Sequence, residues 1–206
     1  MRRAVAGARD PSVEQVAAAR RDPFRVLVAT LLSLRTKDET TEAAAARLLA
    51  VADTPEAILR LAPARIERLI FPVGFYRTKA RRLRSIARDV LERFGGRVPE
   101  DMEDLLSLEG VGRKTANLVL TLGHDRPGIC VDVHVHRITN RWGYVATRRP
   151  DETEAELRRK LPRRHWKTIN GILVTFGRTI CRPVSPWCSR CPVSGACARA
   201  GVTTSR

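Results

Sequence analysis

The sequence predicts an all-α protein, and two observations lead to this fold class. Asp-Pro or Thr-Pro pairs at 10–11, 22–23 and 54–55 are typical of helix starts, with Asp or Thr as the N-cap and Pro in the first turn. Apolar residues then recur at helical spacing, and no segment alternates between apolar and polar residues as a strand between hairpin turns does. The hydrophobic fraction of 43% is ordinary for a globular protein, so a folded core is expected.

The helices are expected in the following order. After the start at Asp22-Pro23, helices are expected from FRVLVATLLSL and from ETTEAAAARLLAVA. TKARRLRSIARDVLERF is predicted to end at Gly95-Gly96 and to place its apolar residues on one side, namely Leu83, Ile86, Ala87, Val90, Leu91 and Phe94. MEDLLSLEGVGRKTANLVLTL is predicted to form a helix, a glycine turn and a second helix. Three further helices are expected from VHVHRITNRW, DETEAELRRKL and KTINGILVTFGRTI.

The charge of the chain indicates a polyanionic partner. The net charge is +16, and the 38 basic residues comprise 33 arginines and 5 lysines. A GC-rich genome could explain the arginine bias, but not the gap between 38 basic and 22 acidic residues. Nucleic acid is therefore the favoured partner. An anionic membrane is the alternative, but the sequence has no apolar run of about 18 residues and no basic amphipathic anchor. The N-terminus has no apolar core of signal-peptide length, so a reducing, cytoplasmic location is expected.

Four of the five cysteines follow the pattern C-x6-C-x2-C-x5-C, and they are Cys181, Cys188, Cys191 and Cys197. Disulfides fit poorly with a reducing compartment. Structural zinc usually takes two C-x2-C pairs, and only one is present here. The wider gaps favour a [4Fe–4S] cluster with one thiolate per iron, while zinc and unligated cysteines remain as alternatives. Cys130 lies outside this spacing and is expected to be a small core residue.

The turn that contains Gly110 and Gly112 is a candidate phosphate site. Both glycines can adopt positive φ, which would let backbone N–H groups converge at the start of the next helix. Such a contact positions DNA without reading its sequence. An ordinary turn between two helices is the alternative. Lys114 follows this turn, and a lysine that loses its proton can act as a nucleophile where an arginine cannot. A solvated surface charge is the alternative role for Lys114.

Asp132 lies in the apolar run ICVDVHV at a predicted helix start. It could be an N-cap, or a carboxylate that stabilises positive charge at a sugar carbon. The two roles are compatible, because a capping aspartate is held rigidly and can still face a cleft.

Taken together, the glycine turn with Lys114, the V-D-x-H run at 131–134 and the cysteine spacing resemble endonuclease III, a family of helix-hairpin-helix DNA glycosylases with an iron–sulfur cluster. The resemblance extends from about Pro23 to Cys197 and includes LLSLRTKDETT and GFYRTKA. It implies a two-lobed helix-hairpin-helix DNA glycosylase fold with a C-terminal [4Fe–4S] cluster loop. A change in composition near HDRPG (124–128) marks the expected division. Residues 20–126 would form a six-helix barrel domain, and residues 1–19 plus 127–206 an iron–sulfur cluster domain.

The resemblance also implies an activity. The chain would be a monomeric, bifunctional DNA glycosylase and AP lyase that acts on oxidised pyrimidines or abasic sites in double-stranded DNA. Lys114 matches the nucleophile of the family and Asp132 its catalytic carboxylate. The expected DNA contacts are Gly110, Gly112, Arg113, Arg35, Asp38, Phe75, Tyr76 and His134.

The sequence departs from the family pattern at several positions. Arg35 stands where many relatives have a glutamine that enters the gap left by the flipped base, and Phe75 stands where a leucine wedge is common. Glu109 replaces a frequent proline, and Arg182 is the only basic residue between the first two cluster cysteines. Two other functions remain: a monofunctional mismatch glycosylase that removes adenine or thymine, and a silent DNA-binding paralogue. Lys114 argues against the first, because relatives of that kind generally lack this lysine, and Lys114 together with Asp132 argues against the second.

Overall fold

The computed structural model describes residues 5, 7–8 and 10–206, and across these residues it contains helices and loops but no strand. The predicted all-α fold class is confirmed. The chain divides into two compact units, residues 12–126 and residues 1–11 plus 127–206, and each is described by itself below. Residues 1–4, 6 and 9 of the predicted cluster domain lie outside the described residues. No helix in the described ranges is both long and apolar enough to cross a membrane.

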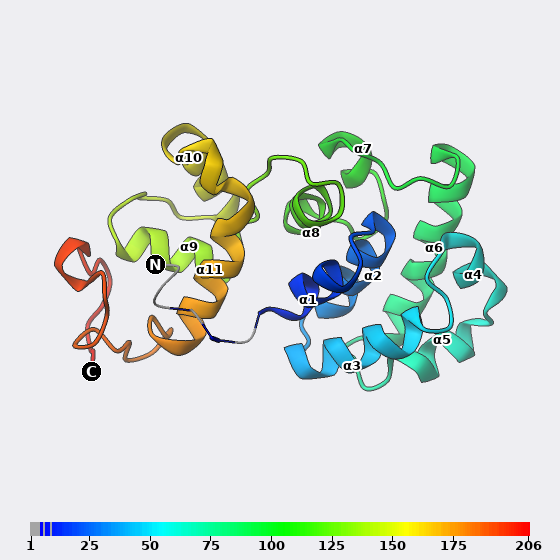
Figure 1. Cartoon of the computed structure of the whole chain (residues 1–206), viewed down its shortest axis with the longest axis horizontal. Coiled ribbons are helices and arrows are strands. Elements are labelled where there is room, and N and C mark those ends of the chain that lie inside the picture. Colours follow the sequence, from blue (N-terminus) through cyan, green and yellow to red (C-terminus); the bar gives the residue numbers. More distant parts are fainter. Residues whose placement is uncertain (1–4, 6, 9) are drawn as a thin grey trace. The chain divides into compact units, whose positions relative to one another are not determined.

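The unit of residues 12–126 is built around its second helix. Eight of the eleven residues of α2 are buried, and the helix packs against α1, α3, α6, α8 and η2 (Figure 1). The buried hydrophobic core of the unit includes Leu27, Leu32 and Leu48 from α2 and α3. The elements of this unit are α1 (Ser12–Ala19), α2 (Pro23–Ser33), α3 (Asp38–Leu49), α4 (Pro55–Arg60), α5 (Pro63–Ile70), α6 (Tyr76–Phe94), α7 (Met102–Leu106), α8 (Arg113–Leu118) and η2 (Val119–Gly123).

Two of the three predicted helix starts are confirmed in detail. The carboxylate of Asp22 accepts hydrogen bonds from the backbone N–H groups of Phe24 and Arg25 and caps α2. The hydroxyl of Thr54 accepts from the backbone N–H of Ala57 and caps α4. Each cap satisfies a donor that has no partner within its own helix.

The start of α1 differs from the prediction. The helix begins at Ser12, after the Asp10–Pro11 pair, and the Ser12 N–H donates to the Asp38 carboxylate at 3.3 Å. The capping acid thus comes from the start of α3, which lies far away in the sequence. Because α1 packs against α2 and α3, residues 12–19 belong to the 12–126 unit. The predicted domains differ from this division at residues 12–19, which were expected in the cluster domain.

Helix α6 has the predicted apolar face. Leu83, Ile86, Ala87 and Val90 are buried, while Leu91 and Phe94 are partly buried. The helix ends at Gly95, whose φ of 60° lies in the left-handed region that glycine adopts without strain. The arginine-rich face of α6 is therefore left toward solvent.

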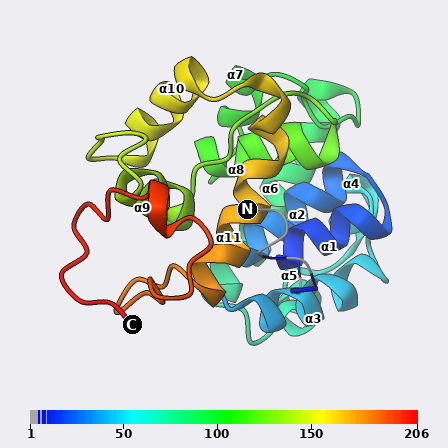
Figure 2. The ribbon, with the colours of Figure 1, turned by 60° about the vertical axis from the view of Figure 1, so that its left-hand side comes forward.

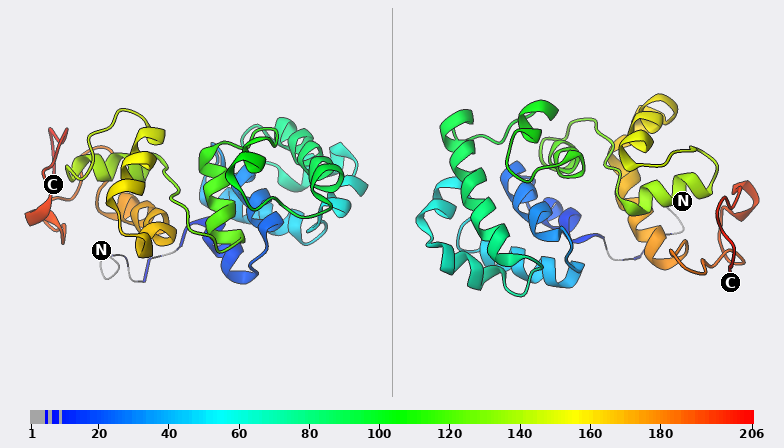
Figure 3. Two further views of the ribbon diagram at one scale, coloured as in Figure 1. Left: turned by 90° about the horizontal axis from the view of Figure 1, so that it is seen from above. Right: turned by 180° about the vertical axis from the view of Figure 1, so that it is seen from behind.

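The second unit contains α9 (Val133–Arg141), α10 (Pro150–Lys160), η3 (Arg163–His165), α11 (Trp166–Thr179) and η4 (Ser194–Ala196). Helices α9 and α11 pack together (Figure 2) over a core that includes Ile138, Leu173 and Phe176. Cys130 is buried, as predicted, with 2% of its surface exposed. After α11 the chain forms a long loop that returns to α9, where the Ala200 N–H donates to the Arg141 carbonyl at 3.0 Å (Figure 3).

Candidate functional site

The glycine turn joins α7 to α8 and needs glycine at one position. Gly110 has a φ of +77°, and a Cβ placed there would lie 3.0 Å from Cδ of Arg82. Gly112 has a φ of −100° and a ψ of 176°, which is ordinary extended backbone at the N-cap of α8. Of these two glycines, Gly110 alone uses the freedom to adopt positive φ, and a Cβ at Gly112 would meet no atom within 4 Å.

Arg113 and Lys114 are the first two residues of α8, immediately after this turn. Arg113 is exposed, whereas Lys114 is partly buried. The following residues of α8 are buried, and the helix continues directly into η2, which fixes the direction of its first turn. Gly112 has no side chain to cap the first backbone N–H groups, so these groups are suited to an anionic ligand.

Glu109 is paired in the structure. Its Oε1 lies 3.6 Å from Nε of Arg82, and both side chains are more than one third exposed. Such a pair contributes little to stability, on the order of 0–1 kcal/mol. It does, however, offset the negative charge that Glu109 adds beside the basic first turn of α8.

Two loops present Arg35 and Phe75 in unusual backbone conformations. Arg35 has a φ of 53° and Phe75 a φ of 58°, and each left-handed non-glycine residue costs on the order of 1–3 kcal/mol. The Arg35 guanidinium lies over the Phe75 ring at 5.7 Å from its centroid, and Phe75 is 63% exposed. Next in the chain, Tyr76 begins α6 and makes an edge-to-face contact with Phe71 at 5.5 Å.

A cavity of about 420 Å³ lies beside these two residues. Its lining is apolar on α2 and basic on α6 and on the loop after α2, and comprises Leu31, Leu34, Arg35, Phe75, Thr78, Lys79 and Arg82. Lys79 and Arg82 were not among the site residues predicted from the sequence. Lys79, like Lys114, is one of five lysines in this arginine-rich chain, so its residue type was the signal in the sequence that could have found it.

Asp132 caps α9, as one of its two predicted roles requires. Its Oδ1 accepts hydrogen bonds from the backbone N–H groups of His134 and Val135, both at 2.9 Å. The side chain is partly buried. His134, a predicted DNA contact, lies against α11, because a Cβ on Gly177 would be only 2.3 Å from its Nδ1. The Nδ1 of His134 is also 3.1 Å from Nη2 of Arg137.

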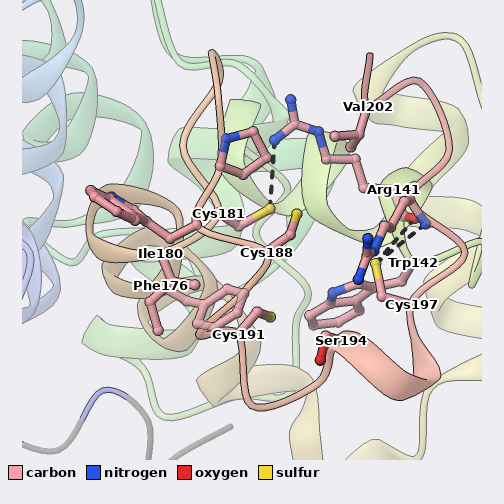
Figure 4. A pocket seen from close by; sticks show the side chains of 13 residues that line it. Arg141, Trp142, Phe176, Ile180, Cys181, Cys188, Cys191, Ser194, Cys197 and Val202 are labelled. Atoms are coloured by element: carbon pink, nitrogen blue, oxygen red, sulfur yellow. Dashed lines mark hydrogen bonds between the residues drawn. The ribbon is translucent and has the colours of Figure 1, made fainter. Parts of the chain in front are cut away.

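The four cysteines of the C-terminal loop line one cavity (Figure 4). Apolar side chains from α9, α11 and the loop complete its wall, among them Trp142, Phe176, Ile180 and Trp187. Two sulfurs accept hydrogen bonds: Nη1 of Arg141 donates to Sγ of Cys181 at 3.5 Å, and the Arg199 N–H donates to Sγ of Cys197 at 3.4 Å. The four cysteines therefore share one cavity, and their role as a common set of ligands stays a prediction.

The four cysteines lie close enough to affect the ionisation of one another. Burial raises the pKa of the Cys191 thiol above its usual value, and the other three cysteines raise it further, against a backbone hydrogen bond at Val193 that lowers it. Arg137 and Arg141 of α9 donate to the backbone carbonyls of Cys181 and Arg182, at the start of the loop. Across the residues that the structure describes, no three His, Cys, Asp or Glu side chains are arranged to hold a single metal ion. A cluster with one thiolate per iron does not need that arrangement.

The predicted site residues are divided between the two units. Lys114, the glycine turn, Arg35, Asp38 and the Phe75–Tyr76 pair belong to residues 12–126. Asp132, His134 and the four cysteines belong to the other unit. Two predicted DNA contacts, Asp38 and His134, make structural contacts within their own units, with Ser12 and Gly177 respectively.

Comparison with known proteins identifies the family. Residues 28–163 match the model of the HhH-GPD superfamily base excision DNA repair protein. Endonuclease III of Thermotoga maritima is 50% identical over 176 residues, which cover 85% of this chain and 83% of the relative. The chain spans about half the length of the chloroplastic endonuclease III homologs of Arabidopsis thaliana, which are longer proteins.

Two solved structures have the same fold. The structure of a trapped endonuclease III–DNA covalent intermediate superimposes with a TM-score of 0.81 at 30% identity and covers 91% of this chain and 92% of the other. A thermostable thymine-DNA glycosylase gives 0.82 at 26% identity over 94% and 89%. On the strength of the family match and of these similarities, the chain belongs to the HhH-GPD superfamily of base excision DNA repair proteins.

Proposed function

We propose that the chain is a bifunctional DNA glycosylase and AP lyase that removes oxidised pyrimidines from double-stranded DNA. The observation that carries this proposal is Lys114 in the first turn of α8, directly after the Gly110 turn. The similarity to endonuclease III, one of whose solved structures is a covalent intermediate with DNA, supports a covalent mechanism.

The proposed reaction begins when the damaged nucleotide is flipped out of the stack. Lys114, after losing its proton, attacks C1′ of the deoxyribose and the damaged base departs. Asp132 stabilises the positive charge that develops at C1′. It is suited to this because its Oδ1 is held by two N–H donors, which fixes the orientation of the carboxylate. The resulting Schiff base permits β-elimination, which cuts the strand on the 3′ side of the site.

Double-stranded DNA is the proposed partner. The net charge of +16 supplies the attraction. The backbone N–H groups at the start of α8, together with Arg113, would bind a phosphate and set the position of the duplex. Arg35 and Phe75, which are exposed and stacked on each other, would enter the space that the flipped nucleotide leaves.

The four cysteines are proposed to hold a [4Fe–4S] cluster. Support comes from the shared cavity, from the N–H donors to two of the sulfurs and from the two arginines beside the loop. Bound there, the cluster would join the C-terminal loop to α9 and α11 and would take no part in base removal.

Borohydride trapping tests the proposed activity. Wild-type protein should be trapped covalently on a thymine-glycol duplex and on an abasic duplex, because borohydride reduces a Schiff base to a stable amine. Lys114→Ala and Lys114→Arg should bind the duplex and yet give no trapped complex, base removal or strand cleavage, since neither side chain supplies an amine. Lys160→Ala removes an exposed lysine on α10 and should behave as wild type. Cleavage by Lys114→Ala at the wild-type rate would refute the assignment.

A second candidate is supported by the similarity to a thermostable thymine-DNA glycosylase. A monofunctional enzyme of that kind would release thymine from a mismatched duplex and give no trapped complex. A silent DNA-binding protein would do neither. The same assay, with a thymine–guanine duplex added, therefore separates the three functions.

A further inference from the structure

Lys79 is a buried lysine in the first turns of α6, with only 6% of its surface exposed. Its Nζ donates to three oxygens: the carbonyls of Leu32 and Leu34, at 2.9 and 2.5 Å, and the hydroxyl of Thr36 at 3.2 Å. The last carbonyls of a helix lack intrahelical partners. The ammonium therefore satisfies carbonyls at and just beyond the end of α2 and fixes the path by which the chain leaves that helix.

The hydrogen bonds of Lys79 join two loops, residues 34–36 and residues 73–76. The Thr36 hydroxyl that accepts from Lys79 also accepts from the backbone N–H of Gly74 at 3.2 Å. A Cβ on Gly74 would lie 2.7 Å from the Arg35 carbonyl oxygen, so the two backbones are in direct contact. Each loop carries one left-handed residue, Arg35 in the first and Phe75 in the second.

Strained backbone conformations persist only where the surroundings hold them. At this place the holding contacts converge on one ammonium group, since Lys79 bonds to the residues on both sides of Arg35. We propose that Lys79 is a positioning residue that locks the two loops together, so that Arg35 and Phe75 enter the DNA stack as one preassembled unit. This inference rests on the proposed glycosylase function.

The charge of Lys79 matters, because a neutral amine has two N–H donors for three acceptors. Burial lowers the pKa of Lys79 from 10.5 to about 8. The charged groups on the neighbouring elements are Arg35 and Lys37 from the loop after α2, Asp38 from the start of α3, and Arg82 from α6. Arg82 is paired with Glu109. In the folded protein the lysine therefore loses its charge as the pH rises through about 8.

Deprotonation of Lys79 weakens the contacts that hold the two loops, but it does not lower the free energy of unfolding. Between about pH 8 and 10.5 the unfolded chain binds the proton that the folded protein has released, so this group makes the free energy of unfolding rise with pH. Loss of the loop geometry in this range would thus occur without a loss of global stability from Lys79. The two effects can be measured separately.

The test uses Lys79→Met, which keeps the length of the side chain but removes its donors. Single-turnover rates are measured from about pH 6.5 to about 9.5 on a thymine-glycol duplex and on a pre-formed abasic duplex, together with thermal unfolding. At the low end of this range, the single-turnover rate of the variant on the lesion duplex should be about tenfold below that of wild type, in keeping with the loss of a stacking contact. The decrease on the abasic duplex should be smaller. In wild type, the ratio of the lesion-duplex rate to the abasic-duplex rate should fall toward the ratio of the variant as the pH rises. Lys160→Met, which removes a charge from an exposed site, should keep the wild-type ratio.

Two results for the variant would overturn the inference. The variant could keep the wild-type ratio at every pH, or its deficit could be the same at both ends of the pH range, which would indicate a packing role only. If Lys79→Met does not fold, wild type is compared with Arg35→Ala instead. The ratio of the lesion-duplex rate to the abasic-duplex rate should fall near pH 8 in wild type and stay constant in Arg35→Ala. A ratio that stays constant in wild type, or that falls equally in Arg35→Ala, would overturn the inference. Wild type that neither releases the base nor forms a trapped complex would refute the proposed function, whereas active wild type with an equally active variant refutes the role of Lys79 alone.

Discussion

At the scale of single residues, Asp132 combines a structural and a proposed chemical role, and the two are separable by one substitution. Asparagine keeps an oxygen that can accept from the N–H groups of His134 and Val135, but it has no negative charge. Asp132→Asn should therefore fold and bind DNA like wild type, while base removal slows by roughly 10²–10³-fold, the magnitude typical of a lost electrostatic contact in a transition state.

Asp22→Asn is the matched control for this substitution. Asp22 caps α2 through the same two kinds of N–H contact, and no chemical role is proposed for it. Single-turnover base removal and DNA affinity should be measured for both variants. Unchanged turnover in Asp132→Asn would reduce Asp132 to a helix cap.

Arg35 is expected to set the preference for the base opposite the lesion. Its guanidinium can stack on neighbouring bases and donate in a plane, which suits the O6 and N7 acceptors of guanine. The single-turnover rate of Arg35→Ala on a lesion duplex should be roughly ten- to a hundredfold below that of wild type, because a stacking contact contributes about 1–3 kcal/mol. The loss should be greatest opposite guanine and smaller on a pre-formed abasic site. The measurement is the rate of each protein on duplexes with each of the four bases opposite the lesion. An equal decrease for all four would show that Arg35 does not recognise the opposite base.

Among the structural elements, the turn between α7 and α8 should respond differently to substitution of its two glycines. Gly110→Ala places a Cβ at positive φ and 3.0 Å from Arg82, so it should cost about 1–3 kcal/mol of stability and move Arg82 away from Glu109. DNA affinity should fall for all sequences alike, since a phosphate contact carries no sequence information. Gly112→Ala is the control, because Gly112 has ordinary dihedral angles and open space at its Cβ position.

Thermal unfolding and binding to undamaged duplex at fixed salt would measure both variants. Equal effects of the two substitutions would show that the conformation of Gly110 is not what matters in this turn. A larger effect of Gly112→Ala on binding alone would instead indicate close approach of DNA to the N-terminus of α8.

The helix starts at α2 and α4 could be predicted because each depends on a few residues in sequence. Asp22 and Thr54 cap N–H groups only two or three positions further on. The start of α1 could not be predicted in this way. Its first N–H is satisfied by Asp38, 26 residues away, which only the packing of α1 against α3 brings into contact.

At the scale of the whole molecule, the cluster is expected to hold the C-terminal loop in place. Most of residues 181–206 are exposed or only partly buried, so this segment has little apolar core of its own. Purified protein should contain about four irons per chain. Cys188→Ser should lower the iron content and the melting temperature. Cys130→Ser, at a buried position outside the cavity, should leave the iron content unchanged. Stoichiometric zinc in protein purified without oxygen would contradict the assignment.

The fold class, most of the helices and the place of Lys114 directly after the glycine turn could all be predicted from local sequence. Each depends on spacing over a few residues, which local backbone geometry converts directly into structure. The tertiary structure decided the left-handed conformations of Arg35 and Phe75 and the burial of Lys79. Lys79 meets its hydrogen-bond acceptors across 43 to 47 residues of sequence. Contacts over such separations are created by the packing of α2 against α6, and no local pattern encodes them.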